Sequence, residues 1–127
     1  MPTAVKSRSR KIRPQIKVWL EVDREHAFCS GMCRILRAVE QTGSIKEAAK
    51  EVGRSYRFVW GRLKRIEEAF GVSLVDAHVG GARERRSTLT PAGRCLVESF
   101  AELEEALHRT VDEGGARLSE SLRKAAR

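Results

Sequence analysis

The sequence lacks several features that would assign it to other classes of protein. It has no apolar run long enough to cross a bilayer, and Lys17 and Glu21 interrupt the one stretch that could serve as a secretion signal. Its 3 cysteines are an odd number, which suits reduced thiols better than a disulfide framework. The sequence shows no enzyme-like site: we find no paired carboxylates, no phosphate-cradling glycine loop and no Cys–His dyad in a plausible catalytic context. We therefore expect a cytoplasmic protein that is not an enzyme and holds no cofactor or metal.

Positive charge is abundant and unevenly distributed. The chain has 25 Lys and Arg against 17 Asp and Glu, a net charge of +8, and its pI of about 10.0 lies in the range of nucleic-acid-binding domains. Residues 1–20 and 54–66 contain no acid, and residues 83–94 contain a single one, Glu84. The acids gather instead over residues 98–113. Because phosphates attract clustered cations, this distribution favours a nucleic acid as partner.

Hydrophobic periodicity predicts a mostly helical fold with a small β component. Apolar residues alternate over residues 16–22, which predicts a strand with one buried face. The helical period then recurs over residues 26–42, 44–53, 55–70 and 91–112. A short strand at 74–75, a polar loop at 77–87 and a returning strand at 88–89 complete the pattern. Residues 1–13 are expected to form a flexible basic arm and residues 114–127 a tail, leaving 14–113 as the folded domain.

Capping residues predict where these helices begin and end. Ser44 with Glu47 forms a capping box, Ser55 precedes the next helix, and Thr90 is followed by proline at the first helical position. Glycines follow three of the predicted helices, the first and third of them Gly43 and Gly71. The last helix is expected to end near residues 114–115.

Two helices joined by a tight turn, followed by a basic hairpin, form the plan of a winged helix-turn-helix. Such a fold places its second helix in the major groove, where Arg57 is the best candidate to read a guanine. Hydroxyl groups and helix N-termini would contact phosphates. The full predicted DNA-binding set is Ser44, Arg54, Ser55, Tyr56, Arg57, Trp60, Lys64, Arg83, Arg85 and Arg86.

Several short motifs in register resemble the N-terminal DNA-binding domain of ModE-type molybdate-responsive regulators and, more distantly, that of LysR-type regulators. They are Thr42-Gly43-Ser44-Ile45, Ala48-Ala49, Ser55-Tyr56-Arg57 with Trp60, Leu74-Val75, Gly80-Gly81 and Leu89-Thr90 followed by Gly93. The resemblance covers residues 16–112 and implies a homodimeric, double-stranded-DNA-binding transcription regulator.

The sequence departs from the ModE-type pattern at two places. Residues 82–87 replace the glycine run of the family's wing with a charged segment, and no residues follow 127 to form the domains that sense molybdate. Molybdate sensing is therefore not expected.

The last predicted helix carries an apolar stripe in a region rich in acids. A domain of this size cannot cover so long a helix on its own, so the stripe predicts a dimer interface. Its members are Leu96, Phe100, Leu103, Leu107 and Val111.

Two alternatives remain open. Winged helices also serve as protein-docking or RNA-binding modules. His26, Cys29 and Cys33 are spaced to share one helical face, which would suit a metal or redox sensor, although three ligands on one short helix leave a metal incomplete.

Overall fold

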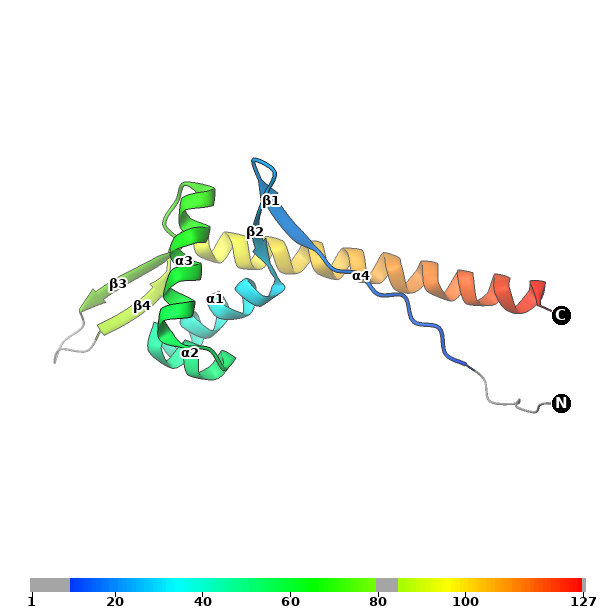
Figure 1. Cartoon of the computed structure of the whole chain (residues 1–127), viewed down its shortest axis with the longest axis horizontal. Coiled ribbons are helices and arrows are strands. Elements are labelled where there is room, and N and C mark those ends of the chain that lie inside the picture. The colour runs from blue at the N-terminus through cyan, green and yellow to red at the C-terminus, as the bar shows by residue number, and fades with distance from the viewer. Residues whose placement is uncertain (1–9, 80–84, 127) are drawn as a thin grey trace. The chain divides into compact units, whose positions relative to one another are not determined.

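The computed structural model describes residues 10–79 and 85–126. The chain divides into two compact units, one formed by Val18–Leu103 and the other by the two ends of the chain. The described part of the second unit consists of residues 10–17 and 104–126. Among the described residues, the larger unit contains four strands and three complete helices, and a further helix begins there and continues into the smaller unit (Figure 1).

An antiparallel hairpin opens the larger unit. Strand β1 (Trp19–Val22) pairs with β2 (Glu25–Cys29), and Leu20 lies opposite the fully buried Phe28. Asp23 and Arg24 both adopt positive φ, of 52° and 69°, as a tight two-residue hairpin turn requires. The strand predicted over residues 16–22 is confirmed for residues 19–22 and begins three residues later than expected. The prediction that the first helix starts at His26 is wrong, because the turn reverses the chain and residues 25–29 pair with β1 instead.

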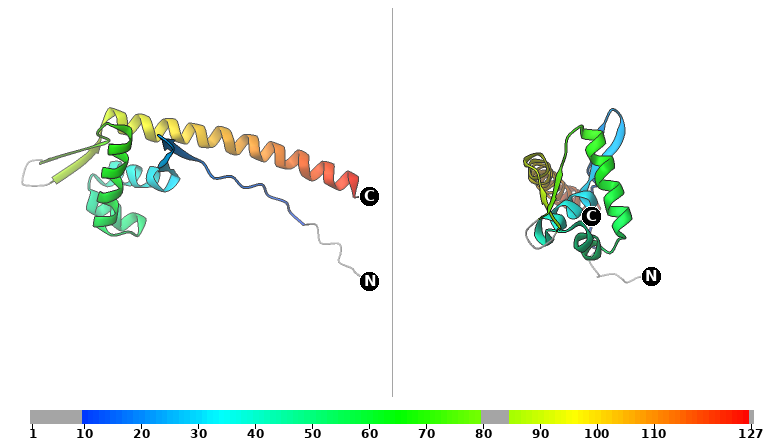
Figure 2. Two further views of the ribbon diagram at one scale, coloured as in Figure 1. Left: turned by 45° about the horizontal axis from the view of Figure 1, so that its top comes forward. Right: turned by 90° about the vertical axis from the view of Figure 1, so that its left-hand side faces the viewer.

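Three helices form the centre of the larger unit: α1 (Ser30–Thr42), α2 (Ile45–Val52) and α3 (Tyr56–Phe70). Figure 2 shows them grouped together in both views. The capping predictions are confirmed at both serines, since Ser44 Oγ accepts from Glu47 N at 3.1 Å and Ser55 Oγ accepts from Phe58 N at 3.0 Å. Apolar faces of the helices meet in one core, whose central members include Leu36, Val39, Ala48, Val59 and Leu63.

The second hairpin consists of β3 (Val75–Val79) and β4 (Arg85–Leu89), paired antiparallel with Val75 opposite Leu89. Figure 1 shows it extending away from the three helices. Its base is fixed by Ser87 N, which donates to Gly43 O at 2.8 Å, and by Thr90 N, which donates to Leu74 O at 2.9 Å. Both strands are longer than predicted, because cross-strand pairing recruits polar residues that the sequence pattern indicated as loop.

Helix α4 (Pro91–Ala125) begins at the predicted Thr90 cap, where Thr90 Oγ1 accepts from Gly93 N at 3.0 Å and donates to Ser73 O at 2.7 Å. A Cβ on Gly93 would collide with the carbonyl oxygen of Leu74, so this glycine lets the helix approach β3 closely. In the smaller unit, Gly115 is similarly close to the ring of Pro14.

The predicted end of this helix near residues 114–115 is wrong, since it continues to Ala125. Each glycine in a helix costs only about 1 kcal/mol, and good helix formers rather than proline follow. The segment 114–125 is thus helix. The predicted fold class, mostly helical with a small β component, is confirmed. No helix in the described ranges is long and apolar enough to cross a membrane.

Candidate nucleic-acid interface

Helix α3 has one buried face and one exposed, basic face. Val59, Leu63 and Ile66 point into the core and are at most 3% exposed. The opposite face is basic up to residue 65, with Arg57, Lys64 and Arg65 at exposed positions on α3 and Arg54 just before its first turn, while the exposed Glu68 lies nearer its end. A helix with this division presents a row of positive side chains to whatever meets its outer side.

The arginines of this face lack acidic partners. Within residues 10–79 and 85–126, no carboxylate lies within 4.0 Å of the guanidinium groups of Arg54, Arg57, Arg62 or Arg65, whereas arginines on α4 form ion pairs with Glu105 and Glu120. Unpaired arginines keep their fork of donors available for phosphates or base edges. The basic face of α3 is therefore suited to bind a polyanion.

Phe58 holds two of these arginines, a role that sequence reasoning missed. The guanidinium of Arg54 lies 4.6 Å from the centre of the Phe58 ring, and that of Arg62 lies 5.0 Å from it. The three residues are spaced four apart in the sequence, so the spacing that brings them together was visible there. Stacking on one ring reduces the freedom of both side chains before any ligand arrives.

Trp60 and Lys64 form a second, smaller cluster on the same helix. The Lys64 ammonium lies 5.4 Å from the Trp60 ring centre and 3.4 Å from Glu67 Oε1. Trp60 and Tyr56 remain 46% and 48% exposed, so both aromatic rings are accessible to a ligand. Both belong to the predicted DNA-binding set, and the structure places them on the helix that carries the arginines.

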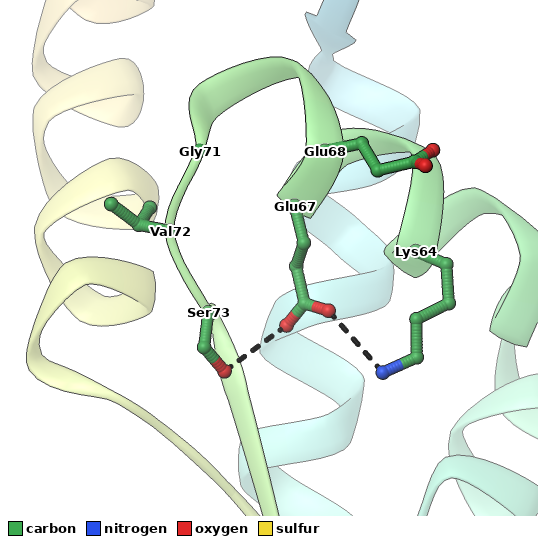
Figure 3. A pocket seen from close by; sticks show the side chains of 6 residues that line it. All are labelled: Lys64, Glu67, Glu68, Gly71, Val72 and Ser73. Atoms are coloured by element: carbon green, nitrogen blue, oxygen red, sulfur yellow. Dashed lines mark hydrogen bonds and ion pairs between the residues drawn. The ribbon is translucent and has the colours of Figure 1, made fainter.

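Glu67 connects the end of α3 to the start of the β3–β4 hairpin (Figure 3). Its Oε2 accepts hydrogen bonds from Leu74 N at 2.7 Å and Val75 N at 3.2 Å, while Ser73 Oγ approaches at 3.4 Å. One carboxylate thus satisfies the backbone of the segment that enters β3. Because Glu67 belongs to α3, these hydrogen bonds fix the start of the hairpin relative to the basic helix. Glu67 also contacts Lys64.

The remaining predicted contacts are distributed around α3. Ser44 and Ser55 cap α2 and α3, and each hydroxyl can still donate its proton while its oxygen accepts the capping bond. Arg86 is exposed on β4, opposite His78 of β3. Arg83 and the side chain of Arg85 lie outside the described residues, so the predicted contacts at the hairpin tip are not tested.

The prediction that His26, Cys29 and Cys33 share one helical face is wrong, because two of them lie in a strand. His26 is exposed on β2, Cys29 ends that strand, and Cys33 is buried on α1 with its Sγ 3.9 Å from Val97 O. Their separation follows from the strand that replaces the predicted helical turn. Among the described residues, no group of three His, Cys, Asp or Glu side chains is placed to hold a metal ion.

Comparison with known proteins agrees with this geometry. The chain is 37% identical over 84 residues to the molybdenum-pterin-binding protein MopA of Rhodobacter capsulatus, covering 65% of this chain and 32% of MopA. It is 32% identical over 101 residues to the molybdenum transport protein ModE of Azotobacter vinelandii, covering 80% of this chain and 37% of ModE. The chain thus spans about a third of the length of these relatives.

A solved structure shares the fold. The full-length LTTR LysG from Corynebacterium glutamicum aligns with a TM-score of 0.51 and 24% identity, covering 72% of this chain and 28% of LysG. Residues 31–94, half of the chain, match the lysR family of bacterial regulatory helix-turn-helix proteins. That stretch runs from the start of α1 through the β3–β4 hairpin into α4, and includes every described residue of the basic face. The chain belongs to the lysR family of bacterial regulatory helix-turn-helix proteins.

Proposed function

We propose that this protein is a sequence-specific regulator of transcription that binds double-stranded DNA as a homodimer. The observation that carries the proposal is the basic surface of α3, where four arginines on the helix or just before it, one of them half-buried, have no carboxylate partner in the described chain. Helix α3 is the second helix of the helix-turn-helix, the position from which a helix enters the major groove.

The residues of this face would contact different parts of the DNA according to their position. Arg57 lies in the first turn of α3, the part of a recognition helix that reaches base edges, and would read a guanine through two hydrogen bonds. The N-termini of α2 and α3, capped by Ser44 and Ser55, would bind phosphates and fix the register of the helix on the duplex. Arg86 on β4 would add a contact to the backbone beside the groove.

Dimerisation through α4 is supported by apolar residues that the described chain leaves uncovered. Leu103 is 40% exposed, while Leu118 and Leu122, beyond the predicted stripe, are 58% and 55% exposed. Leu107 and Leu118, like Val111 and Leu122, are 11 residues apart, a spacing that keeps side chains on one side of a helix. A second copy would cover this stripe with the same surface.

Two members of the predicted dimer interface pack against the core of their own protomer. Phe100 is 2% exposed and packs edge-on against Phe28 at 5.1 Å between ring centres, and Leu96 packs against the same core. They anchor the start of α4 rather than face a partner. We therefore centre the proposed interface on Leu103, Leu107, Val111, Leu118 and Leu122.

A ModE-like manner of DNA binding is the finer part of the proposal. It rests on the identity to MopA and ModE, together with the resemblance of the Thr42-Gly43-Ser44 turn and the Ser55-Tyr56-Arg57 start of α3 to the ModE-type pattern. The molybdenum and pterin in the names of those relatives describe those proteins, and we do not extend either to this chain.

Fluorescence anisotropy with two labelled probes tests the proposed ligand. We expect the protein to bind a duplex selected from a random library at least tenfold more tightly than a single-stranded RNA of equal length, at the same salt concentration. An RNA-binding module would reverse the order, since it reads bases exposed in single strands. A protein-docking module would bind neither probe above background, and either result would refute the proposal.

A further inference from the structure

Gly61 stands in the middle of α3, exposed, at the one place where the basic face has no side chain. Glycine is the poorest helix former after proline, because it loses the most backbone freedom on folding. A Cβ added here would meet no atom within 4 Å. The fold itself therefore gives no reason for a glycine at this position.

The other glycines near α3 have reasons that Gly61 lacks. Gly53 and Gly71 end α2 and α3 with φ of 71° and 70°, a left-handed conformation that favours glycine. Gly93 is required by the close approach of Leu74 O. Gly61 has neither a positive φ nor a close neighbour. Gly31 in α1 and Gly114 in α4 share both properties, so what distinguishes Gly61 is its place on the basic face of α3, where a requirement for it would come from outside the described chain.

The surroundings of Gly61 indicate what that outside requirement is. Arg57 and Arg65 lie one turn before and one turn after it on the same side of the helix. Phe58, with its two stacked arginines, flanks one side, and Trp60, with Lys64, flanks the other. The gap is thus bordered by cations, and a polyanion is the partner that this charge favours.

We propose that Gly61 is a specificity-determining position at which the bare backbone of α3 makes its closest approach to base-pair edges in the major groove. This inference rests on the proposed function, with duplex DNA as the occupant. The missing side chain lets the helix sit deep enough for Arg57 to reach its base, and helix stability is given up for that depth. A side chain at position 61 would hold the helix away from the bases while leaving the phosphate contacts within reach.

Substitution of Gly61 by alanine separates the effect on folding from the effect on binding. G61A should raise Tm by about 4 °C, because alanine favours the helix and has free space here. We expect the same variant to bind the selected duplex about tenfold more weakly, and a scrambled duplex with unchanged affinity. G61L should weaken specific binding further. Anisotropy measures both affinities, and thermal unfolding confirms that each variant is folded.

Gly31→Ala is the matched control. Gly31 lies in helix α1, and a Cβ there would make only an ordinary contact, 3.8 Å from Cys29 Sγ. G31A should leave both affinities unchanged. If G61A binds the selected duplex within twofold of the wild type, Gly61 is an ordinary surface glycine and the inference is wrong, while the proposed function stands. If the wild-type protein itself does not prefer the selected duplex, the proposed function fails instead.

Discussion

Arg57 occupies the first turn of α3, exposed and without an acidic partner in the part of the chain described. If it reads a base, R57A should weaken binding to the selected duplex by about 1–3 kcal/mol, which is roughly 5- to 150-fold. It should also relax the base preference at one position of the site. Competition assays with duplexes substituted at single positions measure both effects.

Arg86→Ala on β4 serves as the control for that measurement. Arg86 is exposed on the hairpin, and a phosphate contact from it would weaken selected and scrambled duplexes by the same factor. A uniform loss in R57A as well would show that Arg57 contacts only the backbone.

Single residues also show where sequence reasoning reaches its limit. Ser44, Ser55 and Thr90 were predicted as caps, and they act as caps, because a capping bond joins residues two or three positions apart. Glu67 could not be assigned, since its partners Leu74 and Val75 are found only after the chain turns at Gly71. Contacts within one turn of a helix are encoded locally, whereas contacts across a turn depend on the fold.

The same distinction between local contacts and contacts that depend on the fold explains which helices and strands the sequence predicted correctly. The bounds of α2 and α3 and the end of α1 agree with the prediction, because each of these helices carries an apolar face with helical period and a glycine beyond its end. Strand β2 was missed because only residues 25–29 form it, and the positive-φ turn at Asp23 and Arg24 that creates its pairing contains no glycine. The extent of β3 and β4 depended likewise on pairing between polar strands.

Helix α4 forms the proposed dimer interface, and a charge placed in its apolar stripe tests that interface. L118E should shift the protein from dimer to monomer, raising the dimer dissociation constant at least 100-fold, because a charge would be placed in an apolar interface. Leu118 is 58% exposed, so the substitution spares the protomer's own core. Sedimentation velocity at micromolar concentration measures the change from a species twice the chain mass of 14.3 kDa.

Ala116→Glu provides the control on the same helix. Residue 116 lies on the opposite side of α4 from Leu118 and is exposed, so A116E adds the same charge outside the stripe and should remain dimeric. A wild-type protein that sediments at 14.3 kDa would refute the dimer itself.

Charge distribution links the whole molecule to its proposed ligand. The net charge of +8 combines a basic α3 and hairpin with an acid-rich stretch of α4, where Glu98, Glu102 and Glu105 are exposed. Phosphates would repel this stretch and attract α3, so the distribution favours binding of DNA through the helix-turn-helix. The sequence predicted this polarity directly, because charge is counted without knowledge of the fold.

The salt dependence of duplex binding tests the central claim most directly. A dimer that neutralises about ten phosphates should release counterions on binding, so the logarithm of the association constant should fall with the logarithm of salt concentration at a slope near −9. Anisotropy titrations of the selected duplex between 50 and 200 mM salt, about the range over which such slopes are resolved, measure it. A slope close to zero would contradict the account, because the cations of α3 would then make no contact with phosphates.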